Sequence, residues 1–537
     1  MTVSSHKPIV LPIATIQHTL PSIASEIYHA IIPSEHVWLS CYIQGEPSVH
    51  GKIKLSLDDE DRAKINFEGK EGVRLERVDE FDYKGECQQL EIDDVTFVFP
   101  KETYVDPVHS DAQYLHQISS FALSLSAHSS TSSNGHTPQN TPGLLATGRA
   151  DGTLAVYTLP SASTLSSSEP RFSEPSETPI TPVFSGRIHK AGVTDVRIAS
   201  INTSSRAHSP VLVSSGMDFS VHVSPIKASI IDSAFSTDLK TVKTKDLKST
   251  RLWRGHTKGV NSIIPIQTSP STSSSRQTEP AQPTVAEPDF LSVAKDGTLR
   301  LWSLSGGQDH QLGVWGSGGF KSINALAAAI DLHTSGTSPQ EVEQNQAGTS
   351  RLRALIWAGL SDGTVEGHDP QLRKSICSLA PPGTSGSGNA GSSKAVTALA
   401  VHASGRWVVS GDAGGLMRLW RVALLEPSVD GAKVEGECVI EWRRNGASVE
   451  AIAFLPMVPS SSGDENHQRL DVVVGTEDGL PYMCSIFVLE NTKVKVEKEF
   501  VFGDVETVRC VRVIGTASGG REVWMSGDGG VVRRYVV

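Results

Sequence analysis

Short apolar stretches separated by turn residues recur along most of the chain, and they set the expected fold. In residues 291–302, two stretches with apolar residues at alternate positions flank the pair Asp296-Gly297. An Asp-Gly pair between two such stretches is a strong signal for a β-hairpin. Seven hairpins of this form are predicted, at residues 146–157, 213–224, 291–302, 357–368, 409–420, 473–484 and 524–535.

An apolar strand is predicted before each hairpin. Seven repeats of a strand followed by a hairpin predict an all-β fold, namely a seven-bladed β-propeller, over residues 115–537. The strands that lead into the hairpins are Ile118–Leu125, Val193–Ile198, Val260–Ile266, Ile323–Ile330, Val396–Val401, Val449–Leu455 and Val505–Val513.

Residues 1–100 do not follow this repeat. Their short alternating stretches lie between glycines and predict a small acidic β region that packs on the propeller. The last repeat shows only three strands before Val537, so we expect its blade to receive an outermost strand from upstream. Val95–Phe99 is rich in β-branched and aromatic residues, and we predict that it is this closing strand.

Segments rich in Ser, Thr, Pro and Gly lengthen the repeats and are expected to be disordered. Five of the seven lie between the first and second strands of a repeat, which places them on one face of the disc. The opposite face keeps short loops and is the expected docking surface, although neutral loop drift would give the same pattern. The segments are Ser126–Pro142, Ser161–Pro182, Ser200–Pro210, Thr268–Pro288, His333–Ser350, Pro381–Ser393 and Pro459–Gln468.

Composition and charge narrow the possible partners. Of the 537 residues 38% are hydrophobic, and no apolar stretch reaches the roughly 18 residues of a spanning helix, so no membrane partner is expected. The net charge of −11, of which residues 1–100 contribute −8, argues against nucleic-acid binding. Six scattered cysteines without a C-x-x-C pair favour a reducing compartment, so we expect a cytoplasmic or nuclear protein.

Motifs for catalysis are absent from the sequence. It contains no phosphate-binding loop, no nucleophile elbow, no H-E-x-x-H and no EF-hand loop, and its 18 histidines show no metal-ligand spacing. We therefore predict no catalytic residue, no cofactor and no metal. A propeller enzyme with a metal on its axis stays open as an alternative, because a fold alone does not fix function.

Charged residues of the short-loop face divide into two sides. Lys258 and Lys295 lie on a basic side, which suits a partner of opposite polarity. An ordinary solvated rim is the alternative. The predicted acidic side consists of Glu450, Glu477, Asp504, Glu506 and Asp528.

The third repeat carries the residues by which the chain resembles the WD-repeat family. His256, Ser292, Asp296 and Trp302 match the four positions that form a buried hydrogen-bonded set in that family. The resemblance implies a structural tetrad. A protease triad is not expected, because the serine lies inside a strand without a nucleophile elbow.

Residues 185–302 resemble consecutive blades of the proteasomal ATPase-associated factor family, through Ser214–Asp218, Arg254–His256 and Ser292–Trp302. The resemblance implies a non-enzymatic chaperone, monomeric on its own, that holds the C-terminal domain of an ATPase subunit of the proteasome regulatory particle during base assembly. The alternative is a WD-repeat scaffold or a substrate receptor of another complex, such as a ubiquitin ligase.

Overall fold

The computed structural model describes most of the chain, and the regular secondary structure of its described residues is almost entirely β-strand. Their one α-helix is α1 (Leu20–Tyr28), so the all-β class predicted from the alternating pattern is confirmed. The structure describes residues 7–61, 64–108, 117–124, 143–159, 172, 174–202, 208–227, 230, 243–266, 289–304, 311–330, 354–382, 393–424, 434–456, 468–488, 492–503, 506–515 and 520–537.

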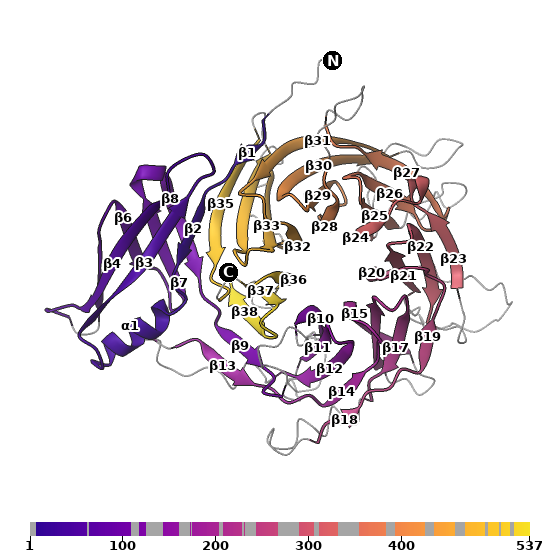
Figure 1. Ribbon diagram of the computed structural model, residues 1–537, viewed down its shortest axis with the longest axis horizontal. Helices are drawn as coiled ribbons and strands as arrows, with labels where there is room; N and C mark the ends of the chain where they lie inside the picture. The colour runs from indigo at the N-terminus through magenta and orange to yellow at the C-terminus, as the bar shows by residue number, and fades with distance from the viewer. Residues whose placement is uncertain are drawn as a thin grey trace, which may run out of the picture.

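Seven sheets follow one another around a central opening, and we name them ring sheets 1 to 7 (Figure 1). Their strands run antiparallel from the opening outward, with a fourth strand on the outside. Ring sheet 1 contains β10 (Ile118–Ser124), β11 (Leu144–Arg149), β12 (Thr153–Thr158), β14 (Phe184–Arg187) and the parallel edge strand β18 (Lys245–Asp246). Ring sheet 2 contains β15 (Val193–Asn202), β16 (His208–Gly216), β17 (Val221–Pro225) and β19 (Arg251–Trp253).

The next three ring sheets repeat this order. Ring sheet 3 contains β20 (Val260–Ile266), β21 (Asp289–Ala294), β22 (Thr298–Ser303) and β23 (Gln311–Gly316). Ring sheet 4 contains β24 (Ile323–Ile330), β25 (Ala354–Leu360), β26 (Val365–Asp369) and β27 (Lys374–Leu379). Ring sheet 5 contains β28 (Val396–Val401), β29 (Trp407–Asp412), β30 (Leu416–Leu424), β31 (Val434–Arg443) and the parallel β1 (Ile9–Val10).

Ring sheets 6 and 7 incorporate strands from the N-terminal region. Ring sheet 6 contains β32 (Val449–Phe454), β33 (Gln468–Thr476), β34 (Tyr482–Val488) and β35 (Lys493–Phe500), and continues through β8 (Ile92–Val98), β7 (Asp82–Cys87) and β6 (Val73–Arg77). Ring sheet 7 contains β36 (Val508–Gly515), β37 (Arg521–Gly527), β38 (Val532–Val536), β9 (Glu102–Val105) and β13 (Ser176–Pro179).

The outer strand of ring sheet 7 does come from upstream, but the prediction that it is Val95–Phe99 is wrong. The strand is β9, which pairs antiparallel with β38. Tyr104 stacks on Trp524 of this sheet, with ring centroids 5.5 Å apart. Val95 and Phe97 instead pack into the core of the N-terminal region, and β8 pairs parallel with β35. Val95–Phe99 and Glu102–Val105 are both short stretches of good strand formers, so the pattern of residues does not distinguish them and only their packing partners do.

A second layer of strands beside ring sheet 6 makes up the N-terminal region. A sheet of β2 (Ile13–Ile16), β3 (Ser34–Tyr42), β4 (Val49–Leu57) and β5 (Ile65–Gly69) shares one apolar core with β6–β8 and α1. Because β8 continues ring sheet 6, this region is attached to the ring by backbone pairing as well as by side-chain packing.

Adjacent ring sheets are joined near the opening by a repeated device. Every innermost strand has a register irregularity at its second residue. At four of these positions the side chain donates to the first backbone carbonyl of the next innermost strand. These bonds run from Ser119 to Val193 (2.5 Å), Thr194 to Val260 (2.5 Å), Asn261 to Ile323 (2.6 Å) and Thr397 to Val449 (2.5 Å).

The two ends of the series also meet. The Ser526 hydroxyl of ring sheet 7 donates to the Ile118 carbonyl of ring sheet 1 at 3.5 Å. Asp195 of ring sheet 2 accepts hydrogen bonds from Ser120 of ring sheet 1 and Ser262 of ring sheet 3, and Arg512 of ring sheet 7 lies 3.6 Å from it. Arg197, 2.9 Å away, and Arg512 lower the pKa of the buried Asp195 carboxyl together with these hydrogen bonds, against the effect of burial. The charged form of Asp195 is therefore favoured at this junction of ring sheets.

The predicted insertions fall mostly outside the described residues. Ser161–Pro182 and Ser200–Pro210 contribute β13 and the ends of β15 and β16. The other insertions lie almost wholly outside the described residues: Ser126–Pro142, Thr268–Pro288, His333–Ser350, Pro381–Ser393 and Pro459–Gln468. At the opposite end of the strands, the second and third strands of each ring sheet are joined by a tight turn. We name that end of the ring the turn face.

Candidate protein-binding face

Tight turns of the turn face share one backbone conformation. In six ring sheets the turn holds a glycine with positive φ, at Gly152, Gly297, Gly363, Gly415, Gly479 and Gly530. Ring sheet 2 has Phe219 in this place, with φ of 70°. Left-handed backbone is unfavourable for a side chain with a Cβ atom, and most of all for a bulky one.

The four residues of the predicted tetrad are joined by hydrogen bonds in ring sheet 3. Trp302 Nε1 donates to Ser292 Oγ at 2.8 Å, and Ser292 lies 2.8 Å from His256 Nε2. His256 Nδ1 lies 3.2 Å from Asp296 Oδ2. The Asp296 carboxylate can only accept, so Nδ1 of the neutral His256 ring carries the proton and donates to it. Nε2 then accepts the proton of the Ser292 hydroxyl.

This tetrad is a structural device that fixes two loops of the turn face. Burial lowers the pKa of His256 to about 4, so the ring is neutral at pH 7. Asp296 also accepts the backbone N–H of Thr257 at 2.8 Å and that of Thr298 at 2.9 Å. The network therefore holds the loop before β20, which carries Lys258, and the turn that carries Lys295.

Ring sheet 2 contains a second network of the same kind, which the sequence reasoning missed. His189 Nε2 lies 2.9 Å from Ser214 Oγ, and His189 Nδ1 lies 3.0 Å from Asp218 Oδ1. The tryptophan of the tetrad is absent, because Ser224 stands in its place. The signal was the shared pattern His-x-x-Gly-Val, which begins at His189 and again at His256.

His189, Asp218 and His222 lie close enough to share a metal ion, with one ligand atom of each within 4.8 Å of the others. Both ring nitrogens of His189 are already hydrogen-bonded, to Ser214 and Asp218. A metal ion would have to replace these bonds, so the arrangement is better suited to holding the turn than to chemistry.

The predicted basic residues lie on the turn face as expected from their loops. Lys258 and Lys295 are exposed, and their loops touch, since the backbone N–H of Lys295 donates to the Gly259 carbonyl at 3.0 Å. Within the described residues no carboxylate forms an ion pair with either side chain. Lys321, which follows nearby, differs because it binds Asp362 at 2.6 Å.

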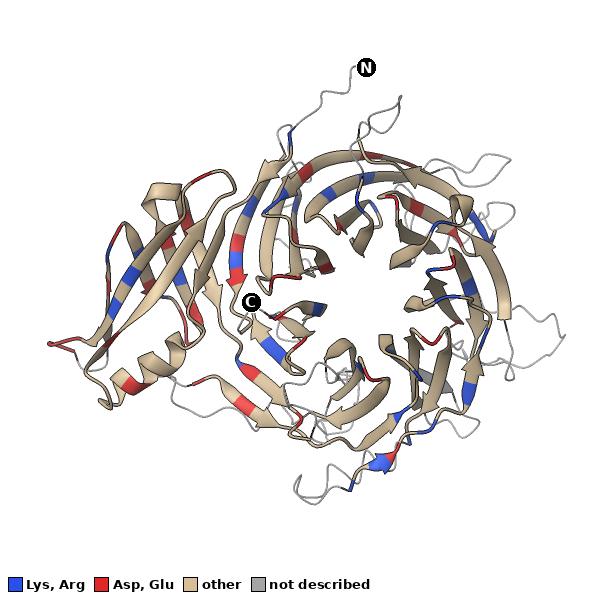
Figure 2. Cartoon of the chain, in the orientation of Figure 1, with Lys and Arg blue, Asp and Glu red and all other residues tan. Residues whose placement is uncertain are grey.

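The predicted acidic side is partly compensated by arginines. Arg509 binds both Glu450 at 3.2 Å and Asp528 at 2.9 Å, and Arg533 binds Glu506 at 3.3 Å. Arginines inside β36 and β38 therefore face these three carboxylates, and the predicted role of the carboxylates in binding a partner stays a prediction. Both signs of charge occur around the whole ring (Figure 2).

Two predicted acidic residues remain. The Glu477 carboxylate is exposed and accepts only the backbone N–H of Ser448, at 3.3 Å, among the contacts of the described residues. Asp504 lies outside the described residues. Among the described members of the predicted acidic set, Glu477 is thus the one without an arginine partner and is available to a partner's cation.

Large apolar side chains are exposed on the turn face beside the lysines, and no sequence pattern had indicated them. Phe219 is 47% exposed and Met217, in the same turn, is 39% exposed. Phe320, in the loop before β24, is 69% exposed and also has positive φ, 52°. Together with Lys258 and Lys295 these residues form a surface of mixed apolar and basic character.

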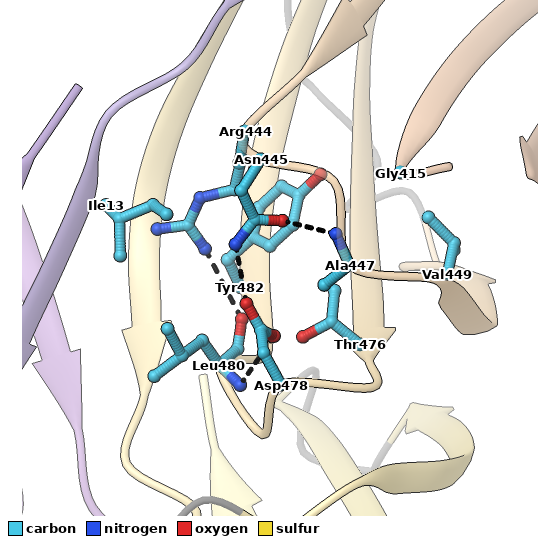
Figure 3. Close-up of a pocket in the computed structure, with 10 residues that line it drawn as sticks. All are labelled: Ile13, Gly415, Arg444, Asn445, Ala447, Val449, Thr476, Asp478, Leu480 and Tyr482. Atoms are coloured by element: carbon cyan, nitrogen blue, oxygen red, sulfur yellow. Dashed lines mark hydrogen bonds between the residues drawn. The ribbon is translucent and has the colours of Figure 1, made fainter. Parts of the chain in front are cut away.

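Ring sheets 5 and 6 enclose a small pocket next to the N-terminal segment (Figure 3). Asn445 donates to Asp478 at 2.6 Å across it, and the Arg444 guanidinium stacks over Tyr482, 4.4 Å from the ring centre. Arg444 also binds the buried Glu499 and the Pro12 carbonyl.

The pocket region therefore fastens the N-terminal segment to the ring. Glu499 accepts the backbone N–H of Ala14 at 3.1 Å, and β1 pairs with β31 beside it. Burial raises the pKa of Glu499 to about 7, while Arg444 opposes the rise. The charged groups here bind each other, so we interpret the pocket as the place where the N-terminal segment is attached to ring sheets 5 and 6.

Comparison with known proteins agrees with this architecture. Residues 381–421 match the family model described as WD domain, G-beta repeat. The match covers the inner strands of ring sheet 5, where Trp420 Nε1 donates to Ser410 Oγ at 2.9 Å. The chain therefore contains a WD40 repeat, a module that typically serves as a non-enzymatic scaffold for protein–protein interaction.

No curated protein matches the chain. Among the described residues, no helix is both long and apolar enough to cross a lipid bilayer.

Proposed function

We propose that the seven ring sheets are the blades of a WD-repeat β-propeller that binds another protein through its turn face, without chemistry. The observation that carries this proposal is the pair of buried networks in ring sheets 2 and 3. They fix loops whose outward side chains are exposed and unpaired among the described residues. A fixed surface loses little conformational entropy on binding, which favours affinity.

The particular partner that we propose is the C-terminal domain of an ATPase subunit in the base of the proteasome regulatory particle. This part of the proposal is supported by the resemblance of residues 185–302 to the proteasomal ATPase-associated factors. The protein would act as a monomeric assembly chaperone in the cytoplasm or nucleus. The alternative is a scaffold or substrate receptor of another complex, for which a propeller would serve equally well.

Affinity purification of the full chain followed by mass spectrometry tests both versions. Enrichment of proteasomal ATPase subunits is expected, and enrichment of a ubiquitin ligase instead would favour the alternative. Glu477→Lys reverses the charge of the free carboxylate and should weaken capture of the ATPase. Glu46→Lys makes the same change at an exposed loop of the N-terminal region and should leave capture unchanged. Equal capture by the wild type and the Glu477 variant would remove Glu477 from the interface.

A further inference from the structure

We propose that Met217, Phe219, Lys258, Lys295 and Phe320 form a docking site for an acidic, extended segment of a partner protein that inserts apolar side chains between the two phenylalanines. We name these five residues the apolar–basic sector. The inference rests on the proposed function and deepens it, because it states which part of the turn face binds and which chemistry it recognises.

The sector is continuous across ring sheets 2, 3 and 4. The Met217 sulfur lies over Gly259, where an added Cβ atom would come within 2.9 Å of it. Gly259 is the neighbour of Lys258 and accepts the N–H of Lys295. On the other side of that turn, Gly297 lies beneath the backbone of Phe320, where a Cβ atom would approach the Phe320 carbonyl oxygen to 2.4 Å.

Backbone strain at both phenylalanines indicates that these side chains are needed for something other than folding. Phe219 stands where six other ring sheets have glycine, and Phe320 is likewise left-handed. A buried ring could compensate this strain by packing, but these two are 47% and 69% exposed. Strained residues cluster at ligand-binding and other functional sites, which favours such a role for these two.

Hydrogen bonds hold the turn and the loop that carry the two phenylalanines. Asp218 accepts the backbone N–H groups of Lys190 at 2.8 Å and Ser220 at 3.3 Å, which fixes the turn that presents Phe219. The loop of Phe320 is closed by Ser317, whose hydroxyl donates to the Lys321 carbonyl at 2.8 Å. The backbone that carries the two rings is therefore ordered before any partner arrives.

Charge selects the partner. Lys258 and Lys295 form no ion pair within the described residues, whereas Lys321 beside them is bound to Asp362. Two free ammonium groups among apolar side chains attract carboxylates and repel a basic segment. A nucleic acid would supply negative charge as well, but the net charge of −11 opposes a polyanion over the rest of the surface.

Selection from a random peptide library displayed on phage, with the full chain as bait, tests this site even while the partner is unidentified. We expect the selected peptides to combine Asp or Glu with Leu, Ile or Phe. Synthetic versions should bind the full chain in a fluorescence-anisotropy titration. The double variants Phe219→Gly/Phe320→Gly and Lys258→Glu/Lys295→Glu should each weaken binding by at least about tenfold, as expected when a buried anchor is lost.

A matched control lies at the other end of the strands, in the hairpin between β26 and β27. Leu372 is 50% exposed and Lys374 is exposed, so Leu372→Ser with Lys374→Glu removes the same kinds of side chain away from the sector. This variant should bind the selected peptides as the wild type does. Circular dichroism should show every variant folded.

The outcomes separate the sector from the broader proposal. Acidic peptides that bind the sector variants as well as the wild type would overturn the sector and leave a scaffold that binds elsewhere. A selection without acidic consensus would also overturn it. If oligo(dT) binds and the lysine variant abolishes binding, the surface recognises nucleic acid instead. Self-association in sedimentation that the phenylalanine variant abolishes would make a second copy the occupant. If the affinity purification captures no proteasomal ATPase while acidic peptides still bind the apolar–basic sector, only the proposed chaperone role would be contradicted.

Discussion

The strain at Phe219 predicts an unusual order of stability among substitutions. Phe219→Ala and Phe219→Gly both remove the half-exposed ring, so they lose the same contacts. Alanine keeps a Cβ atom at φ of 70°, where it costs about 1–2 kcal/mol. Glycine avoids this cost but loses about 0.5–1 kcal/mol more backbone entropy on folding. The glycine variant should therefore be the more stable of the two, by up to about 1.5 kcal/mol.

Trp38 provides the matched control for this comparison. It is 43% exposed and lies within β3, in extended backbone where glycine has no conformational advantage. Trp38→Gly should be less stable than Trp38→Ala, by about 0.5–1 kcal/mol. Subtracting the two differences cancels the entropy of glycine and leaves the strain at residue 219.

Urea unfolding followed by circular dichroism measures all four variants under one condition. The midpoints should change order between the two sites, with glycine above alanine at 219 and below it at 38. If alanine is the more stable variant at both sites, the turn of ring sheet 2 relaxes without cost. The strain argument for the apolar–basic sector would then fail, whatever the binding experiments show.

Three further substitutions test other parts of the structure. Thr397→Val removes the hydroxyl that joins ring sheets 5 and 6 and should lower the free energy of unfolding by about 1 kcal/mol in urea titrations. Arg444→Met leaves the buried Glu499 carboxylate without its cation, so the free energy of unfolding should fall by about 3–5 kcal/mol. Amide exchange in residues 9–14 should become faster, because Glu499 also holds the backbone of Ala14. Unchanged exchange there would show that this ion pair does not fasten the N-terminal segment to the ring. Burial lowers the pKa of His222 from 6.5 to about 4, so the unfolded chain binds more protons within that pH interval and stability falls as the pH falls through it. His222→Asn should flatten this dependence by up to one proton, measured as urea midpoints between pH 7 and pH 4, and an unaltered slope would exclude His222 as its source.

The strands of the ring were predictable because their signals are local. Alternating apolar residues and Asp-Gly turns define each hairpin, and each predicted hairpin lies in one ring sheet. The outer strand of ring sheet 7 was not predictable in the same way. Val95–Phe99 and Glu102–Val105 are both good strand formers, and the choice between them depends on distant partners such as Trp524.

Side-chain pairing across the turn face explains what the sequence could not supply about the site. Glu450 and Asp528 are far apart in the chain, and only folding brings Arg509 between them. Charge counted along loops therefore overestimated the acidic side. Phe219 is the opposite case, since its place in the series of turn glycines is visible in the sequence. The sequence did not indicate that the Phe219 ring would be exposed.

The buried hydrogen-bond networks of ring sheets 2 and 3 support the backbone that carries the exposed apolar–basic sector. The side chains of His189, Asp218, His256 and Asp296 are almost fully buried. Their carboxylates nevertheless hold the backbone beside Phe219 and Lys258. Ring sheets 2 and 3 are where His-x-x-Gly-Val occurs with an aspartate in the following turn. The same two ring sheets carry Met217, Phe219, Lys258 and Lys295. Because pre-ordered loops lose little conformational entropy when a partner binds, this coincidence favours ring sheets 2 and 3 as the part of the turn face where a partner first docks.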